Sequence, residues 1–264
     1  MSNNRYGQGY LIYAFGKEYI EMAVELSRSI QRTQTHKLAA LVYDEDTPPS
    51  LEDARWFEHL IPINRKDAPP MACEWQAFAL SPFKETIKLD ADMIIHESID
   101  HWWPIMRQQE VCFTTNVRTY QNNMVTSRAH RKLFDDNDLP NIYTALYYFR
   151  YSMTATKLFR FAHEITMNWN DVARTLKGNT DLSIRTDEVF AIAAQLVGLD
   201  KCTLPGLTVP TFVHMKEEIN GLSNTKPWPE QLYCENYMRM IDSNSQYYPV
   251  HYGHRNFEAL DVKK

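Results

Sequence analysis

The sequence predicts an α/β protein built on a mostly parallel sheet with helices on both faces. From the N-terminus onward, short apolar and aromatic runs alternate with segments whose apolar residues recur at helical spacing. The apolar runs are short and continuous, which is typical of strands that are buried on both faces. A length of 264 residues fits one large domain of this class.

The first sixty residues predict three strands and two helices. Strands are expected at Gly9–Phe15, Lys37–Tyr43 and His59–Ile63, and helices at Lys17–Arg32 and Leu51–Glu58. In the longer helix the apolar residues recur every three or four positions, so one of its faces is apolar. Strands that alternate with helices in this way favour parallel pairing through crossover helices.

The rest of the chain continues the pattern with longer gaps. Helices are expected at Ala72–Leu80, Thr154–Leu176 and Asp187–Val197, and strands at Glu85–Ile95, Val111–Val117, Ile142–Arg150 and Thr208–Met215. The segment Thr119–Asn141 is polar and irregular, and Gly198 is placed to stop a helix. The tail Lys216–Lys264 mixes glycine, proline and aromatic residues without long periodicity. Open α/β sheets bind their ligands at the carboxyl ends of the strands.

Composition and charge exclude several classes of protein. The four cysteines form no CxxC pair, which argues against a zinc ribbon, an iron–sulfur cluster or a disulfide scaffold and predicts buried thiols in a reducing compartment. The net charge of −5 provides no overall basic field, so nucleic acid would need a local patch. The apolar runs are far shorter than the roughly 18 residues of a membrane helix, and no signal-peptide layout is present. We therefore expect a soluble, cytoplasmic protein.

Two aspartates, Asp90 and Asp92, lie inside an apolar strand. Residues two apart in a strand face the same side, so both carboxylates can point at one spot. Carboxylates in apolar surroundings are costly unless paired, and Mg²⁺ or Mn²⁺ is the natural partner because it joins carboxylates to a diphosphate. Capping of a neighbouring helix or pairing with an arginine is the alternative. The D-x-D triplets at 44–46 and 136–138 lie in polar turns, where solvated acids are the simpler interpretation.

Four segments resemble, in order and spacing, the motifs of GT-A fold glycosyltransferases of the family-8 type. They are Tyr13-Ala14-Phe15, Ser81-Pro82-Phe83 with Lys88 to Asp92, Arg185 to Phe190, and Val213-His214 followed by Asn220-Gly221 and Lys226-Pro227-Trp228. The resemblance covers most of residues 9–228, and the Lys-Pro-Trp element with its upstream histidine is its most specific part. It implies a GT-A catalytic domain over residues 1–215, with residues 216–264 as the closing loop and tail of the same domain.

The resemblance also implies metal-dependent transfer of a sugar, with retention, from a nucleotide-sugar (UDP-sugar in the first place) to a hydroxyl acceptor. It places the metal at Asp90, Asp92 and His214, the donor at Tyr13, Ala14, Tyr19, Lys226 and Trp228, and catalysis at Asp187 and Glu188. Mn²⁺ is favoured over Mg²⁺ because one ligand is an imidazole. His251 and His254 are rival ligands. Plain structural roles remain open for these residues: a backbone-bonded histidine, core packing, a proline turn or a helix-dipole interaction.

The chain departs from the family pattern at three places. Six residues separate His214 from Gly221, where the family has about two, so the closing loop is longer. Glu74-Trp75-Gln76 occupies the helix on which the family carries a basic residue, and Asn141 to Leu146 replaces the usual Asn-x-Gly strand that recognises the sugar. The departures leave the sugar open between a hexose and a pentose, and they affect the metal site little.

The only local basic cluster runs from Arg118 to Lys132. Tyr120, Arg128, Arg131 and Lys132 are the candidate acceptor contacts, because basic side chains hold phosphates and an aromatic ring stacks on a base. Compact phage enzymes of this style glycosylate hydroxymethylated cytosine, which makes double-stranded DNA a leading acceptor and the host cytoplasm the location if the protein is phage-encoded. The alternatives are a saccharide or protein acceptor, or a solvated helix face without a binding role.

Two other classes of function compete. A nucleotidyltransferase would carry a glycine-rich basic loop after its first strand, and the stretch AFGKEY is not such a loop. A non-catalytic module that binds a nucleotide-sugar or DNA would show binding without turnover. The sequence contains no P-loop, no G-x-G-x-x-G after a strand and no H-E-x-x-H, so NTPase, dehydrogenase and zincin functions have no support.

Overall fold

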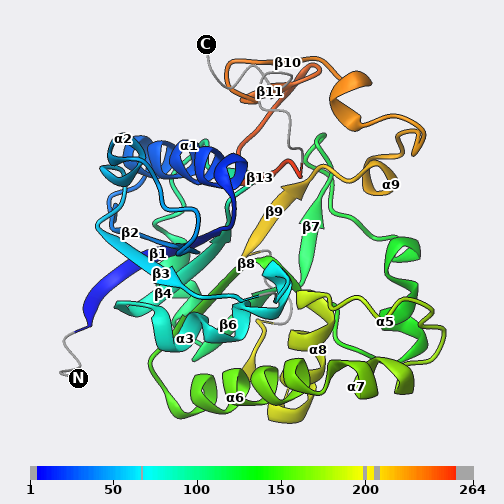
Figure 1. Cartoon of the computed structure of the whole chain (residues 1–264). Helices are drawn as coiled ribbons and strands as arrows, with labels where there is room; N and C mark the ends of the chain where they lie inside the picture. The colour runs from blue at the N-terminus through cyan, green and yellow to red at the C-terminus, as the bar shows by residue number, and fades with distance from the viewer. Residues whose placement is uncertain (1–4, 67, 199–200, 205–208, 254–264) are drawn as a thin grey trace.

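The main sheet has six strands in the order β3-β2-β1-β4-β8-β6 (Figure 1), in a computed structural model that describes residues 5–66, 68–198, 201–204 and 209–253. The strands are β1 (Tyr6–Ala14), β2 (Ala39–Asp44), β3 (His59–Ile63), β4 (Phe83–Asp90), β6 (Val111–Thr114) and β8 (Tyr143–Arg150). Strands β1 to β4 are mutually parallel, and β8 runs antiparallel to both of its neighbours. The predicted α/β class with a mostly parallel sheet is therefore confirmed.

Both faces of the main sheet are covered, because successive side chains of each strand point to opposite faces. In β1, Tyr10 packs into one core together with helix α1 (Lys17–Thr33). The next residue, Leu11, packs into a second core with helices α6 (Met153–Met167) and α8 (Thr186–Val197). The helices thus leave only the strand ends of the sheet available for a binding site.

A second sheet, in the order β5-β13-β9-β7, adjoins the carboxyl end of the main sheet. Its strands are β5 (Met93–Ile94), β7 (Asn116–Arg118), β9 (Thr211–His214) and β13 (Val250–His251). Strand β5 follows β4 and strand β7 follows β6 within two residues, so the chain passes twice from one sheet directly into the other (Figure 1). The sequence did not predict this sheet, and the two expected strands Glu85–Ile95 and Val111–Val117 are each divided between the sheets.

The remaining helices are short. They are α2 (Leu51–Ala54), α3 (Ala77–Leu80), α4 (Trp102–Met106), α5 (Lys132–Asp136), α7 (Trp169–Thr175) and α9 (Glu217–Asn220), with 3-10 turns η1 (Pro70–Ala72), η2 (Glu74–Gln76), η3 (Ala129–Arg131) and η5 (Trp228–Glu230). The expected helix Thr154–Leu176 is broken at Asn168, whose side-chain amide donates to the carbonyl of Glu164 at 2.8 Å and competes with the helix backbone. Gly198 ends α8 with φ 108°, as predicted.

The C-terminal segment folds back beside α1. It carries a small antiparallel sheet of β10 (Cys234–Glu235), β11 (Met240–Ile241) and β12 (Asn244–Ser245). Tyr237 ties this sheet to α1, because its hydroxyl donates to Glu25 and its ring lies under the guanidinium of Arg32, 4.7 Å from the centroid. Among the described helices, none combines the length and the apolar character that crossing a bilayer requires.

Candidate active site

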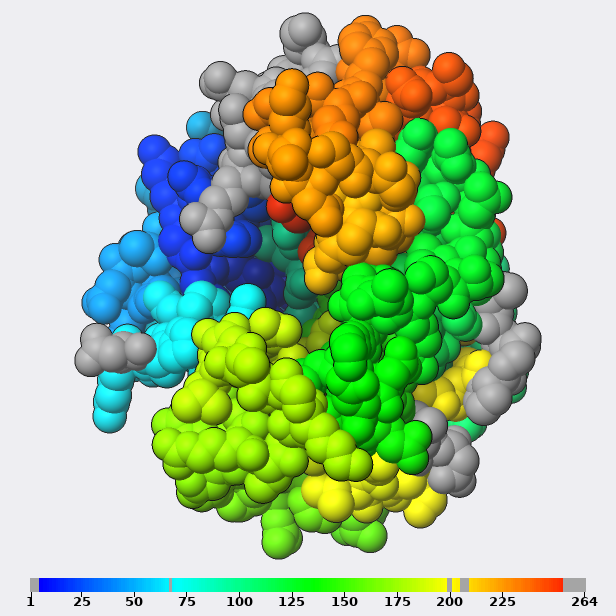
Figure 2. Space-filling model, turned by 90° about the vertical axis from the view of Figure 1, so that its right-hand side faces the viewer, coloured from blue at the N-terminus to red at the C-terminus, as the bar shows by residue number. Residues whose placement is uncertain are grey.

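The carboxyl ends of β1 and β4 meet at the start of the second sheet. Tyr13 of β1 is the register partner of Asp90 in β4, and the chain turns through Ala91 and Asp92 into β5. This is the edge at which open α/β sheets bind ligands. In the space-filling view the surface is hollowed between the N-terminal segments, in blue and cyan, and the segments coloured green to orange (Figure 2). Atoms coloured red, from the C-terminal end of the described chain, lie at the rim of this hollow.

Asp90, Asp92 and His251 form a compact cluster at this edge, with ligand atoms that all lie within 4.8 Å of one another. Nε2 of His251 is 3.2 Å from Oδ1 of Asp92 and 3.8 Å from Oδ2 of Asp90. Burial opposes the charged form of both partners, but their ion pair outweighs it, so the pKa of Asp92 is lowered and the pKa of His251 is raised. Two carboxylates and one imidazole are a donor set that suits Mn²⁺. The residues present therefore fit a divalent cation.

His214, the third metal ligand predicted from the sequence, lies on β9 directly beside His251. Their ring centroids are 4.8 Å apart, and Nδ1 of each ring is buried with no hydrogen-bond partner in the described structure. Burial and the neighbouring His251 hold the pKa of His214 well below its usual value, so this ring is neutral. The cluster contains His251 and not His214, whereas His254 lies outside the described residues. The choice between the two described histidines stays a prediction.

A buried lysine holds the other oxygen of Asp90. Nζ of Lys88 is 2.5 Å from Oδ1 of Asp90 and 2.9 Å from Oε1 of Glu74, and it donates to the carbonyl of Thr144 at 3.1 Å. Burial acts to lower the pKa of Lys88, but the carboxylates of Asp90 and Glu74 outweigh it and raise the pKa, so the ammonium stays charged. Lys88 was not among the site residues predicted from the sequence, although Lys88 and Asp90 are two apart in one strand and so face the same side.

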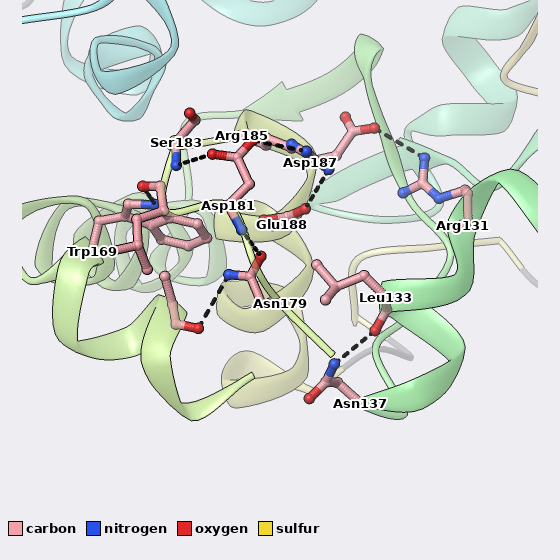
Figure 3. A network of polar contacts seen from close by, with 12 residues as sticks. Arg131, Leu133, Asn137, Trp169, Asn179, Asp181, Ser183, Arg185, Asp187 and Glu188 are labelled. Atoms are coloured by element: carbon pink, nitrogen blue, oxygen red, sulfur yellow. Dashed lines mark hydrogen bonds and ion pairs between the residues drawn. The ribbon is translucent and has the colours of Figure 1, made fainter. Parts of the chain in front are cut away.

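Asp187 is bound through one carboxylate oxygen to strand β8 and through the other to Arg131 in the turn η3. Oδ1 accepts from the backbone N and from Oγ1 of Thr144 at 2.8 and 2.7 Å. Oδ2 accepts from Arg131 at 3.0 Å, as Figure 3 shows. Burial opposes ionisation of Asp187, but Arg131 and Thr144 outweigh it and lower the pKa. Glu188 has a side chain that is only 3% exposed, 3.4 Å from Arg185, and burial raises its pKa. The catalytic roles of Asp187 and Glu188 stay predictions.

The Lys-Pro-Trp element is anchored against the second sheet. Trp228 is buried, its indole N–H donates to the carbonyl of Tyr252 at 2.7 Å, and its backbone N–H donates to Glu217 at 2.8 Å. Lys226, two residues earlier, is exposed. Because Tyr252 follows β13, this anchor places the loop next to the strand that carries His251.

The sequence-predicted base contacts lie at the start of the chain. Tyr13 and Ala14 are buried at the carboxyl end of β1, and Tyr19 is half-buried in the first turns of α1. Burial, reinforced by the carboxyl of Glu74, raises the pKa of Tyr13. These residues stand at the correct edge of the sheet for a donor site, but a contact with a base stays a prediction.

The candidate acceptor residues do not form a free basic surface. The three cations each pair with a carboxylate: Arg128 with Asp135, Arg131 with Asp187, and Lys132 with Asp136. Tyr120 is only 8% exposed, and Arg131 is buried between the rings of Phe134 and Tyr143. Their role in acceptor binding stays a prediction.

Comparison with known proteins identifies the fold. No family model matches this chain, and neither does any curated protein. Among solved structures it is similar to the apo form of mouse xyloside xylosyltransferase 1, with 11% identity, 93% of this chain and 96% of that chain covered, and a TM-score of 0.52. It is also similar to the galactosyltransferase LgtC, solved in complex with donor and acceptor sugar analogues, with 9% identity, 97% and 92% covered, and a TM-score of 0.57. The chain therefore has the GT-A glycosyltransferase fold.

Proposed function

We propose that this chain is a metal-dependent, retaining glycosyltransferase of the family-8 type, which transfers a sugar from a UDP-sugar to a hydroxyl group. The observation that carries the proposal is the cluster of Asp90, Asp92 and His251 at the carboxyl end of β4. Its position coincides with the ligand-binding edge of an α/β sheet, in a fold shared with two glycosyltransferases.

Asp90 and Asp92 would hold Mn²⁺ or Mg²⁺, with an imidazole of His251 or His214 beside them. When bound, a divalent cation stabilises the negative charge that develops on the departing diphosphate. A histidine must be neutral to bind a metal. His214 meets this condition as it stands, whereas His251 must first release the proton that its ion pair with Asp92 favours.

The segment 216–264 would close over the donor bound by the catalytic part, residues 1–215. Exposed Lys226 would contact the diphosphate as a point charge, while buried Trp228 keeps its loop fastened beside β13. A loop that orders over the donor excludes water and so suppresses hydrolysis of the nucleotide-sugar.

Further residues would orient the two ends of the donor. Tyr13, Ala14 and Tyr19 would flank the base at the end of β1. Asp187, held ionised by Arg131 and Thr144, would contact the sugar hydroxyls, and Glu188 would stabilise positive charge near the anomeric carbon, as carboxylates do in glycosidases.

The acceptor would be a hydroxyl group, with hydroxymethylated cytosine in double-stranded DNA as one member of the panel to be tested. Tyr120, Arg128, Arg131 and Lys132 would be the contacts, but the internal pairing of the three cations gives DNA no advantage over a saccharide or a protein. All three acceptor classes therefore belong in the first assay.

Donor class and metal dependence are tested together by thermal unfolding with UDP, GDP and CMP, each with Mn²⁺ and with EDTA. A ligand at 100 times its Kd stabilises the folded state by about 2.7 kcal/mol, which a melting curve resolves. We expect a shift with UDP only when Mn²⁺ is present, and its loss in Asp92→Asn. The matched control Asp46→Asn changes an exposed turn aspartate and should keep the shift. No shift with any nucleotide would contradict the proposal.

Turnover distinguishes an enzyme from a binding module. Radiolabelled UDP-glucose and UDP-xylose are incubated with hydroxymethylated duplex DNA, oligosaccharides or protein, and label in each acceptor is counted after removal of free donor. Label that depends on Mn²⁺ and on Asp92 supports a transferase. Binding of UDP without transfer to any acceptor, and without release of free sugar, would favour a non-catalytic module.

A further inference from the structure

We propose that Lys88 tunes the metal site, so that a divalent cation binds weakly by itself and tightly together with a diphosphate. The inference deepens the proposed function and rests on it, because it concerns the same cluster. Lys88 would be a positioning residue, which acts through Asp90 without touching the metal or the donor. Three features of the structure support it: the geometry at Asp90, the burial of the ammonium and the count of charges.

Asp90 has one oxygen committed to Lys88 and one facing the cluster. Its Oδ1 lies 2.5 Å from the ammonium of Lys88, while its Oδ2 lies 3.8 Å from Nε2 of His251. The ammonium is fixed from two further directions, by Glu74 at 2.9 Å and by the carbonyl of Thr144 at 3.1 Å. Asp90 therefore offers a metal a single oxygen, and its carboxylate cannot rotate freely to offer both.

The ammonium of Lys88 is protected from solvent, while the carboxylate of Asp90 beside it is 33% exposed on the side of the site. The side chain of Lys88 is 1% exposed, so water does not screen its charge as it screens that of a surface lysine. A charge–charge interaction at this distance is several times stronger near a protein interior than in bulk water. The positive charge of the ammonium therefore reduces the attraction that Asp90 would exert on a cation.

The count of charges is low for a site that must hold a dication. Asp90 and Asp92 contribute two negative charges, and Lys88 places one positive charge directly against Asp90 and shares it with the carboxylate of Glu74. A nucleoside diphosphate adds at least two negative charges of its own and oxygen ligands that the protein lacks. The coupling is reciprocal: if bound diphosphate raises the affinity for the cation by some factor, bound cation raises the affinity for the diphosphate by the same factor.

The first test uses the unaltered protein. Free Mn²⁺ is measured by electron paramagnetic resonance during titration, with and without saturating UDP. We expect the Kd for Mn²⁺ to be at least about tenfold lower with UDP, a factor typical of coupling between sites. Equal affinity with and without UDP would overturn the tuning role of Lys88, even though the metal site itself would be established.

The second test removes the ammonium. Lys88→Met alone leaves Glu74 buried without its partner, so Lys88→Met/Glu74→Gln is the main variant and removes both charges. We expect it to bind Mn²⁺ without UDP about tenfold more tightly, because the nearer positive charge is gone and Asp90 regains its second oxygen. The factor by which UDP lowers the Kd for Mn²⁺ should become correspondingly smaller. The control Lys157→Met removes an exposed lysine from α6, to which no binding role is assigned, and should bind Mn²⁺ as the parent does.

The outcomes separate this inference from the proposed function. A purely structural Lys88 predicts weaker Mn²⁺ binding in the double variant, so unchanged or weaker affinity in a folded variant overturns the inference. If the double variant does not fold, the measurements on the unaltered protein decide. Absence of Mn²⁺ and UDP binding in every combination would instead overturn the proposed function, and the inference with it.

Discussion

His96, which follows β5, couples the stability of this fold to pH. It is 8% exposed and lies near the guanidinium groups of Arg239 and Arg32. Burial, reinforced by these two positive charges, lowers the pKa of His96 from 6.5 to about 3. In the unfolded chain the same ring takes up its proton near pH 6.5. The free energy of unfolding is therefore unaffected above pH 6.5 and falls progressively as the pH drops toward 3.

The magnitude follows from the two pKa values. A pH of 5 is 1.5 units below the pKa of His96 in the unfolded chain, so the unfolded chain binds the proton, whereas folded His96 remains neutral. At 1.36 kcal/mol per unit, the free energy of unfolding is about 2 kcal/mol lower at pH 5 than it would be without this titration. At pH 7.5 the same contribution is below about 0.1 kcal/mol. Substitution His96→Gln removes the titrating group and keeps a polar side chain of similar size.

The assay is urea denaturation followed by tryptophan fluorescence at pH 7.5 and pH 5.0, in EDTA so that no metal contributes. We expect the parent protein to lose about 2 kcal/mol more than His96→Gln between the two pH values. His101→Gln, a change at an exposed neighbour, should behave like the parent. The contributions of all other titrating groups cancel when the change in the free energy of unfolding between the two pH values is compared between the parent and His96→Gln. An equal loss in the parent and in His96→Gln would refute the argument.

Two further substitutions test the anchors of the site. Trp228→Phe removes the hydrogen bond to the carbonyl of Tyr252, so we expect the free energy of unfolding in urea to fall by about 1–3 kcal/mol. We also expect a higher KM for the donor, with kcat less affected. An unchanged KM would show that Trp228 has no role in closing the loop over the donor. Arg131→Met removes the cation beside the half-buried carboxylate of Asp187, whose side chain is 32% exposed, so we expect a loss of about 1–3 kcal/mol in the free energy of unfolding, and Arg131→Met/Asp187→Asn should recover part of it. A double variant no more stable than the single one would show that the ion pair does not stabilise the contact between α8 and the turn η3, which carries Arg131.

The parallel half of the main sheet could be predicted from the sequence because its elements are local and long enough. The expected strand His59–Ile63 coincides with β3, and the expected helix Lys17–Arg32 differs from α1 by one residue. The second sheet could not be predicted in this way. Its strands have two to four residues, too few for a periodic pattern, and their pairing depends on contacts between distant segments.

The same distinction between local signals and long-range contacts applies to the residues of the candidate site. Asp90 and Asp92 were found because two carboxylates within an apolar run are a local signal, although the structure ends β4 at Asp90 and places Asp92 in the turn before β5 and not in the same strand. The position of His251 depends on the pairing of β13 with β5, more than 150 residues earlier in the chain, and no local pattern reports it. Lys88 is different, since its alignment with Asp90 was visible in the sequence. Its other partner, Glu74, comes from the turn η2, and only the fold brings the two together.

The second sheet brings the last part of the described chain to the candidate site. Strand β13 is an interior strand, with β5 on one side and β9 on the other, and it supplies His251. Asp92 stands where the main sheet ends and β5 begins, so a cation held by Asp92 and His251 would join the two sheets. A chain that ends before residue 216 would lose an interior strand of the second sheet together with the candidate ligand His251. Metal binding and the packing of the C-terminal segment should therefore stabilise each other.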